Sequence, residues 1–231
     1  MKTLKDYEYF RTENGVLYCG DNMEILPLIT EPIDLCLTDP PYGIDHKITN
    51  KGKTKVYAGN KFALRYDADG RWDKKRPEKQ VFNWIFKNTK NQIICGANYF
   101  VEHIPVSRGW VYWDKMGGGM SSVNNELIFT SFDNSIKEFR RCHGLDKGFQ
   151  VKDDFGGVHP TQKPEALIVF LLNEFSKEKE KVIDLFLGSG TTALACEKLN
   201  RKWIGIEISE KYCEIAKKRI EQYTNQLKLF K

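Results

Sequence analysis

The sequence predicts an α/β fold in which a mostly parallel sheet is covered by helices on both faces. Strand-like apolar runs alternate with helical segments along most of the chain, and near its start two such runs flank a short helix. This alternation is typical of parallel β-α-β units, whose helices pack on the sheet. With 231 residues, 41% of them hydrophobic, the chain suits a single domain, residues 1–231, with a substantial core.

The first half of the chain supplies its elements in a regular order. Strands are predicted at residues 16–19, 33–37, 91–95, 109–113 and 126–131, because these runs are apolar and rich in β-branched or aromatic side chains. Helices are predicted from residue 23 to about residue 29 and over residues 81–89, where Val81, Trp84 and Ile85 share one face. The first two strands and the helix between them form a parallel β-α-β unit.

The second half repeats the alternation after an interruption. Residues 132–158 are polar and lack periodicity, which predicts a loop or a small irregular subdomain. Helices are predicted at residues 164–174 and 191–200, and strands at residues 181–186 and 202–207. Ser209 can cap a final amphipathic helix that ends near residue 223.

Basic charge is concentrated in one segment. The chain carries +5 overall, but residues 44–80 hold eleven Lys and Arg against five Asp and Glu, a net +6. Tyr57, Phe62, Tyr66 and Trp72 lie among these charges. Basic loops with interleaved rings suit a polyanion whose bases can stack, which predicts a nucleic-acid-binding insertion. The alternative is a solvated surface insertion.

The cysteines and the first residues of the chain indicate the cellular compartment in which the protein is expected. Six cysteines are scattered without a C-x-x-C pair, so we expect reduced core residues and no metal site. No apolar run approaches the roughly 20 residues that span a bilayer, and the first residues do not resemble a signal peptide. We therefore expect a cytoplasmic protein with no membrane partner.

The stretch DLFLGSGTT, residues 184–192, predicts a nucleotide-cofactor site. A strand ends at Asp184, glycines follow where backbone must approach a ligand closely, and a helix begins at Thr191. Glu207 ends the next strand, where its carboxylate can accept both ribose hydroxyls. The Asp184 carboxylate can bind an ammonium group, so Asp184 and Glu207 together suit S-adenosylmethionine. An ordinary glycine turn is the alternative.

The stretch TDPPYG, residues 38–43, is too stiff to serve merely as a turn. It follows a buried strand and places Asp39, Pro40, Pro41 and Tyr42 in sequence. Two successive prolines fix two φ angles and cannot donate backbone hydrogen bonds. Such stiffness is useful where a carboxylate, a carbonyl and a ring must be held in one geometry.

Together, DPPY, the stretch HPTQKP at residues 159–164 and DLFLGSGTT resemble the amino-methylating DNA methyltransferases. The catalytic motif precedes the cofactor motif, as in the β group of that family. The resemblance therefore implies a Rossmann-like methyltransferase sheet with a circularly permuted motif order. It also implies methyl transfer from S-adenosylmethionine to the N6 amine of adenine in DNA. No cysteine follows a proline, so the Pro-Cys nucleophile of cytosine-C5 methyltransferases is absent.

The resemblance assigns roles to the DPPY residues. Asp39 and the carbonyl of Pro40 would each accept one hydrogen of the target amine, so that the nitrogen lone pair can point at the methyl group. Pro40 and Pro41 would hold these acceptors in place. Tyr42 would stack on a base rotated out of the duplex.

The predicted cofactor site extends beyond the glycine turn. The resemblance places Asp21 beside the adenine of the cofactor, and His159 and Lys163 at its methionine end, where the Lys163 ammonium would pair with the carboxylate. A capping or packing role is the alternative for His159. The predicted cofactor-binding set is Asp21, His159, Lys163, Asp184, Phe186, Gly188, Ser189, Gly190, Thr191 and Glu207. Asn98 and Glu126 could be polar ligands, but we expect structural roles for them.

DNA is the expected substrate, held in part by Lys51, Lys53 and Lys55 of the basic segment. The resemblance makes residues 132–158 a possible target-recognition region, but this stretch is short for that task. Either the insertion at residues 44–80 shares it, or the enzyme reads a short or loose site, so site-specific and loosely specific methylation both stay open.

A homodimer and a companion restriction enzyme are open possibilities for further partners. The alternatives for the reaction are methylation of cytosine N4, which in this family more often accompanies serine at the position of Asp39, and methylation of an RNA base. A non-catalytic DNA-binding protein with a methyltransferase fold is the alternative of another class.

Overall fold

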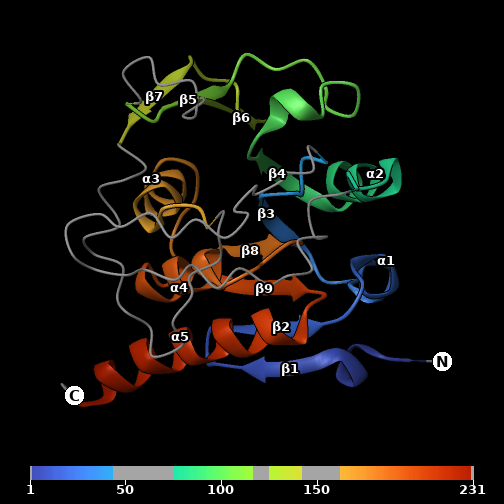
Figure 1. Ribbon diagram of the computed structural model, residues 1–231, viewed down its shortest axis with the longest axis vertical. Helices are drawn as coiled ribbons and strands as arrows, with labels where there is room; N and C mark the ends of the chain where they lie inside the picture. Colours follow the sequence, from blue (N-terminus) through green and yellow to red (C-terminus); the bar gives the residue numbers. More distant parts are fainter. Residues whose placement is uncertain (1, 44–74, 117–124, 142–161, 230–231) are drawn as a thin grey trace, which may run out of the picture.

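The computed structural model of the protein describes residues 2–43, 75–116, 125–141 and 162–229. Within them, nine strands form one sheet in the order β1-β2-β9-β8-β3-β4-β6-β5-β7 (Figure 1). Five of the eight neighbouring pairs are parallel, which confirms the predicted mostly parallel sheet. The strands are β1 (Glu8–Arg11), β2 (Gly15–Cys19), β3 (Ile33–Thr38), β4 (Thr89–Ile94), β5 (Trp110–Asp114), β6 (Glu126–Thr130), β7 (Lys137–Arg140), β8 (Lys181–Asp184) and β9 (Lys202–Glu207).

Helices cover both faces of this sheet, as predicted (Figure 1). The α-helices are α1 (Asn22–Ile25), α2 (Lys79–Asn88), α3 (Glu165–Phe175), α4 (Thr191–Lys198) and α5 (Glu210–Leu229), with 3-10 turns η1 (Leu4–Tyr7), η2 (Leu26–Leu28) and η3 (Ala97–Tyr99). One apolar cluster joins α3, α4 and α5 to one sheet face, and a second joins α1 and α2 to the other. Period-two alternation decides the face: Leu17 belongs to the first cluster, and its neighbours Val16 and Tyr18 to the second.

The connections place a natural ligand site between β3 and β8. From β3 the chain runs through α2 to β4 on one side, whereas from β8 it runs through α4 to β9 on the other side. Strands β3, β8 and β9 are parallel, so their carboxyl ends lie at the same edge. In open α/β sheets, ligands bind outside these ends, where the direction of winding reverses.

The structure differs from the prediction at the sheet margins and at one helix. β1 pairs antiparallel with β2, and β7 lies inside the segment expected to be irregular. Each has four residues on an outer edge with alternating or partial exposure, so neither produces a long apolar run. The helix predicted to reach residue 29 becomes a 3-10 turn after Ile25, because Pro27 cannot donate a helical hydrogen bond.

Two expected segments fall largely outside the described residues. Residues 44–74 of the basic insertion are not described, and its last two residues belong to the start of α2. The possible recognition segment 132–158 is described up to residue 141. Among the described cysteines, Cys36, Cys95, Cys196 and Cys213 are buried free thiols, as predicted.

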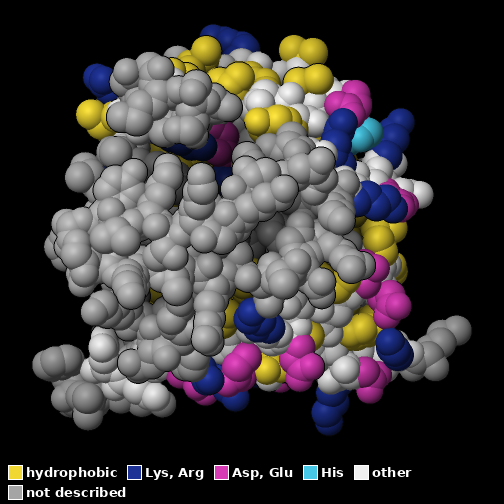
Figure 2. All heavy atoms as spheres, in the orientation of Figure 1, with side chains coloured by type: hydrophobic (Ala, Val, Ile, Leu, Met, Phe, Trp, Pro, Cys, Tyr) yellow, Lys and Arg dark blue, Asp and Glu magenta, His cyan; other side chains and the backbone are white. Residues whose placement is uncertain are grey.

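Surface chemistry varies along the described sheet. Hydrophobic side chains are exposed near the β5–β7 end (Figure 2), and they include Leu127 on β6 and Ile136 just before β7. Lys, Arg, Asp and Glu are mixed elsewhere on the described surface of this view. No helix of the described residues has the length and apolar character needed to cross a membrane.

Candidate active site

A cavity of about 300 Å³ opens at the carboxyl ends of the parallel strands, where the winding reverses. The loop after β8 and the end of β9 line one end of it, and the loop after β3 together with Lys163 lines the other. The lining includes Asp21, Asp39, Lys163, Asp184, Gly188 and Glu207. The sheet therefore brings both predicted motifs to one cavity.

Asp184, the last residue of β8, is held by neutral donors. Its Oδ1 accepts hydrogen bonds from the Thr38 hydroxyl at 2.8 Å and the Phe186 backbone N–H at 3.1 Å. Its Oδ2 accepts from the Thr192 hydroxyl at 2.7 Å. Burial raises the pKa of Asp184 to about 6, and these three hydrogen bonds limit the rise. Asp184 thus ties the end of β3, the glycine turn and the start of α4 together.

Glu207, the last residue of β9, faces the glycine turn. Its Oε2 accepts the backbone N–H of Gly188 at 2.8 Å, and its Oε1 accepts the backbone N–H of Ser209 at 2.8 Å. Burial raises the pKa of this carboxyl group, although the backbone donors act in the opposite direction. Each oxygen keeps a lone pair, so the carboxylate can still accept hydrogen bonds from a ligand in the cavity.

Gly188 and Gly190 are required in the turn for different reasons. Gly188 has φ +55°, and a Cβ there would meet nothing closer than 4.0 Å, so it is needed for its backbone conformation and leaves open space beside the cavity. Gly190 has φ +84° and precedes α4, where a Cβ would lie 2.8 Å from the Cβ of Ala216. Gly190 therefore allows α5 to pack closely behind the turn.

At the other end, Asp39 belongs to a cluster of charged side chains. The Lys163 ammonium lies 2.8 Å from Asp39 Oδ2 and 3.4 Å from Glu126 Oε1. The Tyr42 hydroxyl lies 2.9 Å from Asp39 Oδ1 and 3.0 Å from Glu126 Oε1, and it accepts a hydrogen bond from Lys163 at 2.8 Å. Lys115 pairs with Glu126 Oε2 at 3.1 Å. The negative charges of two carboxylates and the positive charges of two ammonium groups therefore cancel within the cluster.

Burial and ion pairing compete in setting the charges of this cluster. Burial raises the pKa of Asp39, and the charge of Lys163 opposes that rise. Burial also disfavours the charged form of Glu126, but Lys163 and Lys115 hold its pKa below the ordinary value. Desolvation disfavours the Lys163 ammonium, yet the two carboxylates raise its pKa overall. Lys163 therefore stays a cation that binds both carboxylates.

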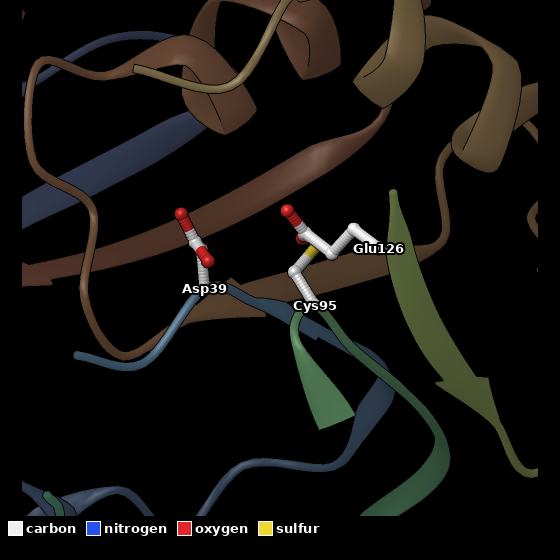
Figure 3. A group of neighbouring side chains, drawn as sticks. All are labelled: Asp39, Cys95 and Glu126. Carbon is white, nitrogen blue, oxygen red and sulfur yellow. The ribbon is translucent and has the colours of Figure 1, made fainter. Parts of the chain in front are cut away.

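Asp39, Cys95 and Glu126 also meet as potential metal ligands. Figure 3 shows them converging from the loop after β3, the end of β4 and the start of β6. The Lys163 ammonium already bridges the two carboxylates, and burial raises the pKa of the Cys95 thiol, which disfavours the thiolate that a metal needs. The donor set therefore suits the resident ammonium and not a metal ion.

The predicted cofactor residues mostly converge on the cavity. Phe186, Gly188, Ser189 and Thr191 line it, and so does Asp21, whose side chain also caps α1 by accepting the Met23 N–H at 2.8 Å. His159 lies outside the described residues, as do Lys51, Lys53 and Lys55. The roles proposed for these four residues stay predictions.

Lys163 and Tyr42 occupy positions that their predicted roles did not anticipate. The ammonium of Lys163 binds protein carboxylates here, because the buried Glu126 and the half-buried Asp39 both stabilise its charge. Pairing with a cofactor carboxylate would require Lys163 to leave them. The Tyr42 ring stacks on Tyr99 with centroids 4.6 Å apart, and Gly96 packs against its edge. In this conformation one ring face is already covered, so base stacking by Tyr42 stays a prediction.

Several site residues were not identified from the sequence. Glu126 was expected to be structural, but it lies inside the charged cluster. Thr38 of TDPPYG and Gln162 of HPTQKP had no assigned role. The Thr38 hydroxyl donates a hydrogen bond to Asp184, and the Gln162 side chain accepts one from the Ser189 hydroxyl at 3.1 Å. A carboxylate opening the otherwise apolar strand ELIFT was the available signal for Glu126.

Known proteins are similar to this chain in sequence and in fold. The chain is 25% identical over 250 residues to the type II methyltransferase M2.LlaDCHI of Lactococcus lactis subsp. cremoris, covering 93% of this chain and 92% of that protein. The crystal structure of the M1.HpyAVI–SAM complex aligns with a TM-score of 0.56 at 18% identity, covering 89% and 98% of the two chains. The PvuII cytosine-N4-specific DNA methyltransferase aligns with a TM-score of 0.57 at 17% identity, covering 95% and 94%.

The fold and the cavity define an α/β enzyme with a nucleotide-type cofactor site at the switch point of its sheet. Residues 47–218, well over half of the chain, match the model of the N6/N4 family described as DNA methylase, and the chain belongs to that family. The predicted family, fold class and DNA methyltransferase activity are therefore confirmed. The family also supports S-adenosylmethionine as the cofactor, in agreement with the sequence.

Proposed function

We propose that this enzyme transfers the methyl group of S-adenosylmethionine to the N6 amine of adenine in DNA. One observation carries the proposal: the Asp39 carboxylate and the Asp184–Ser189 turn line the same cavity. An exocyclic amine is a poor nucleophile, because its lone pair is delocalised into the base. It must therefore meet an acceptor and a methyl donor at once.

The donor set of the cavity fits S-adenosylmethionine. Asp184 and Glu207 accept hydrogen bonds from neutral hydroxyl and backbone groups, and no ion pair joins either carboxylate to a Lys or Arg within the described residues. A ligand with a sulfonium and an ammonium group suits such a negative site, and Glu207 can accept the ribose hydroxyls. When bound, the cofactor supplies an electrophilic methyl group. Asp21, Phe186, Gly188, Ser189 and Thr191 would surround it.

The residues at the Asp39 end bind and orient the amine. Asp39 accepts one amino hydrogen, and the Pro40 carbonyl accepts the other, which aims the nitrogen lone pair. Lys163 and Tyr42 fix the two oxygens of Asp39 from one side each, so the carboxylate does not reorient during the reaction. The amine loses one proton after methyl transfer, and Asp39, whose pKa is raised by burial, can accept it.

The proposal also covers how the enzyme binds DNA, which partners it has and where it is located. We place duplex DNA against residues 44–80, with Lys51, Lys53 and Lys55 on phosphates, and assign base reading to this insertion or to residues 132–158. The type II designation of M2.LlaDCHI supports a companion restriction enzyme as a partner. A homodimer and a cytoplasmic location stay predictions.

The test is direct identification of the product. Purified enzyme is incubated with S-adenosylmethionine and, in separate reactions, with mixed-sequence duplex DNA or with RNA, and the digested nucleosides are separated by mass spectrometry. We expect N6-methyladenine. N4-methylcytosine would replace the proposed substrate by cytosine, and an absence of methylated bases on both DNA and RNA would favour a non-catalytic DNA-binding protein.

A further inference from the structure

Glu126 contacts both ammonium groups and the tyrosine hydroxyl of the cluster around Asp39. It opens β6, is 5% exposed, and its Oε1 faces both the Lys163 ammonium and the Tyr42 hydroxyl, while Oε2 binds Lys115. Burying a charged carboxylate costs desolvation free energy, even when ammonium and hydroxyl groups bind it. An apolar side chain would fill the same space without that cost, so the position of Glu126 beside Asp39 suggests a role beyond packing.

The partners of Asp39 are shared with Glu126. Lys163 has three ammonium protons, and Asp39, Glu126 and the Tyr42 oxygen all lie within reach of them. The Tyr42 hydroxyl has a single proton, and acceptors from Asp39 and Glu126 lie at nearly equal distances, 2.9 and 3.0 Å. Both carboxylates therefore compete for the same donors.

We propose that Glu126 is a positioning residue of the methyl-transfer reaction, which shares Lys163 and Tyr42 with Asp39 and so leaves Asp39 able to accept the target amine. The inference rests on the proposed function to the extent that Asp39 is the carboxylate that meets that amine. With Glu126 in place, the ammonium orients Asp39 without binding it exclusively. Without that second anion, Lys163 and Tyr42 would bind Asp39 alone, and the amine would have to displace them.

The sharing also fixes how Asp39 titrates. Titratable and charged groups approach Asp39 from each neighbouring element: Tyr42 in its own loop, Cys95 after β4, Glu126 on β6, Lys163 before α3 and Asp184 on β8, with Lys115 behind Glu126. Burial and the negative charge of Glu126 raise the pKa of Asp39, and Lys163 lowers it. Removing the Glu126 charge should therefore lower the pKa of Asp39, whereas weakening the hold of Lys163 should raise it.

Two variants move the pKa of Asp39 in opposite directions. Glu126→Gln keeps the shape and removes the charge, so Asp39 binds Lys163 more tightly and titrates at lower pH. Lys115→Gln leaves Glu126 with Lys163 as its cation, so Lys163 is drawn away from Asp39, which titrates at higher pH. Glu13→Gln, at an exposed position of the turn between β1 and β2, makes the same charge change away from the cluster and from every proposed binding segment, and is the matched control.

The experiment combines a titration with kinetics. Asp39 is followed by carbon NMR of aspartate-labelled free enzyme, with Asp39→Asn used for assignment, and kcat and cofactor KM are measured on duplex DNA. We expect Glu126→Gln to lower kcat roughly 10- to 100-fold, to leave cofactor KM unchanged and to move the acid limb of the pH–rate profile to lower pH. Circular dichroism confirms that each variant is folded.

The outcomes separate this inference from the proposed function. Identical Asp39 titrations in wild type, Glu126→Gln and Lys115→Gln would overturn it, and so would a kcat of Glu126→Gln equal to that of Glu13→Gln. Opposite shifts of Asp39 in the two variants support the sharing of Lys163 even if the methylated base is not adenine. Failure of the wild type to methylate any DNA base would remove the proposed function while the NMR titration still decides the charge sharing.

Discussion

At one end of the cavity, Asp39 and Glu126 are paired with the ammonium groups of Lys163 and Lys115, whereas at the other end Asp184 and Glu207 accept hydrogen bonds from hydroxyl and backbone groups. The first end is charge-balanced before any ligand arrives, which suits a neutral amine that needs an oriented acceptor. The second end keeps its negative charge, which suits a cationic cofactor. The same residue type thus serves two purposes according to its donors.

The largest expected effect comes from removing the acceptor at the paired end. Asp39→Ala should lower methyl transfer at least about 100-fold, because it removes the oxygen that accepts the amino hydrogen and the group that takes up the amine proton. Cofactor affinity should stay unchanged, since Asp184 and Glu207 are intact. Transfer of labelled methyl groups to DNA and a calorimetric titration of S-adenosylmethionine measure the two properties. Retained transfer would mean that Asp39 is not the acceptor and that the two ends do not divide the work.

A second prediction tests the neutral end through the pH dependence of stability. The pKa of Asp184 is about 6 in the folded protein and lies near its ordinary value of 3.8 when unfolded. Its contribution to stability is therefore fully present below about pH 4 and lost as the pH rises to about 6. The loss is on the order of 2–3 kcal/mol.

Urea unfolding between pH 4.5 and 7 measures this contribution. Asp184→Asn keeps the acceptor for Thr38 and the Phe186 N–H but cannot ionise, so its unfolding free energy should fall less than that of the wild type over this range. Asp133→Asn, at an exposed position, is the control. Asp39 and Glu207 add losses of the same sign in wild type and in Asp133→Asn. In Asp184→Asn the loss from Asp39 is smaller as well, because the Asp184 charge that disfavours its ionisation is gone. If the unfolding free energies of Asp184→Asn and wild type fall in parallel with pH, burial does not raise the pKa of Asp184.

A third prediction concerns the cofactor. Glu207→Gln removes the charge and one of two acceptors for the Gly188 and Ser209 N–H groups, so S-adenosylmethionine binding should weaken by on the order of 1.5–3 kcal/mol. The kcat at saturating cofactor should change little, in contrast to Asp39→Ala. Glu210→Gln, in the exposed first turn of α5, is the matched control in the same calorimetric titration. Equal affinities for Glu207→Gln and wild type would remove Glu207 from the cofactor site.

The sequence predicted most of the central sheet because its strands carry their own signal. β3, β8 and β9 are buried apolar runs, and each ends next to a carboxylate that the motifs already singled out. β1 and β7 were missed, since four-residue edge strands with charged ends have no such run. They form because a neighbouring strand offers unpaired backbone groups.

The site was predictable as a list of residues and less so as a network. Asp39, Asp184 and Glu207 line one cavity, because each stands at or directly after the carboxyl end of a parallel strand; their roles in binding and catalysis stay predictions. The hydrogen bond from Lys163 to Asp39 joins residues 124 positions apart, and Glu126 enters from an antiparallel strand. Such pairings depend on strand order, which local periodicity does not encode.

The last and smallest effect lies outside the cavity, where basic charge is predicted to hold the DNA backbone. Changing Lys51, Lys53 and Lys55 together to Gln should weaken DNA binding and reduce the log–log salt slope by about 0.9 for each phosphate that these lysines neutralise in the wild type. Cofactor affinity should not change, because neither end of the cavity uses these side chains. The control changes three exposed lysines at the amino-end edge of the sheet, away from the cavity: Lys87, Lys90 and Lys177. Binding of labelled duplex at several salt concentrations gives both slopes. A slope shared by the triple variant and wild type would remove the insertion from the DNA-binding surface, and the division of labour inside the cavity would stand without it.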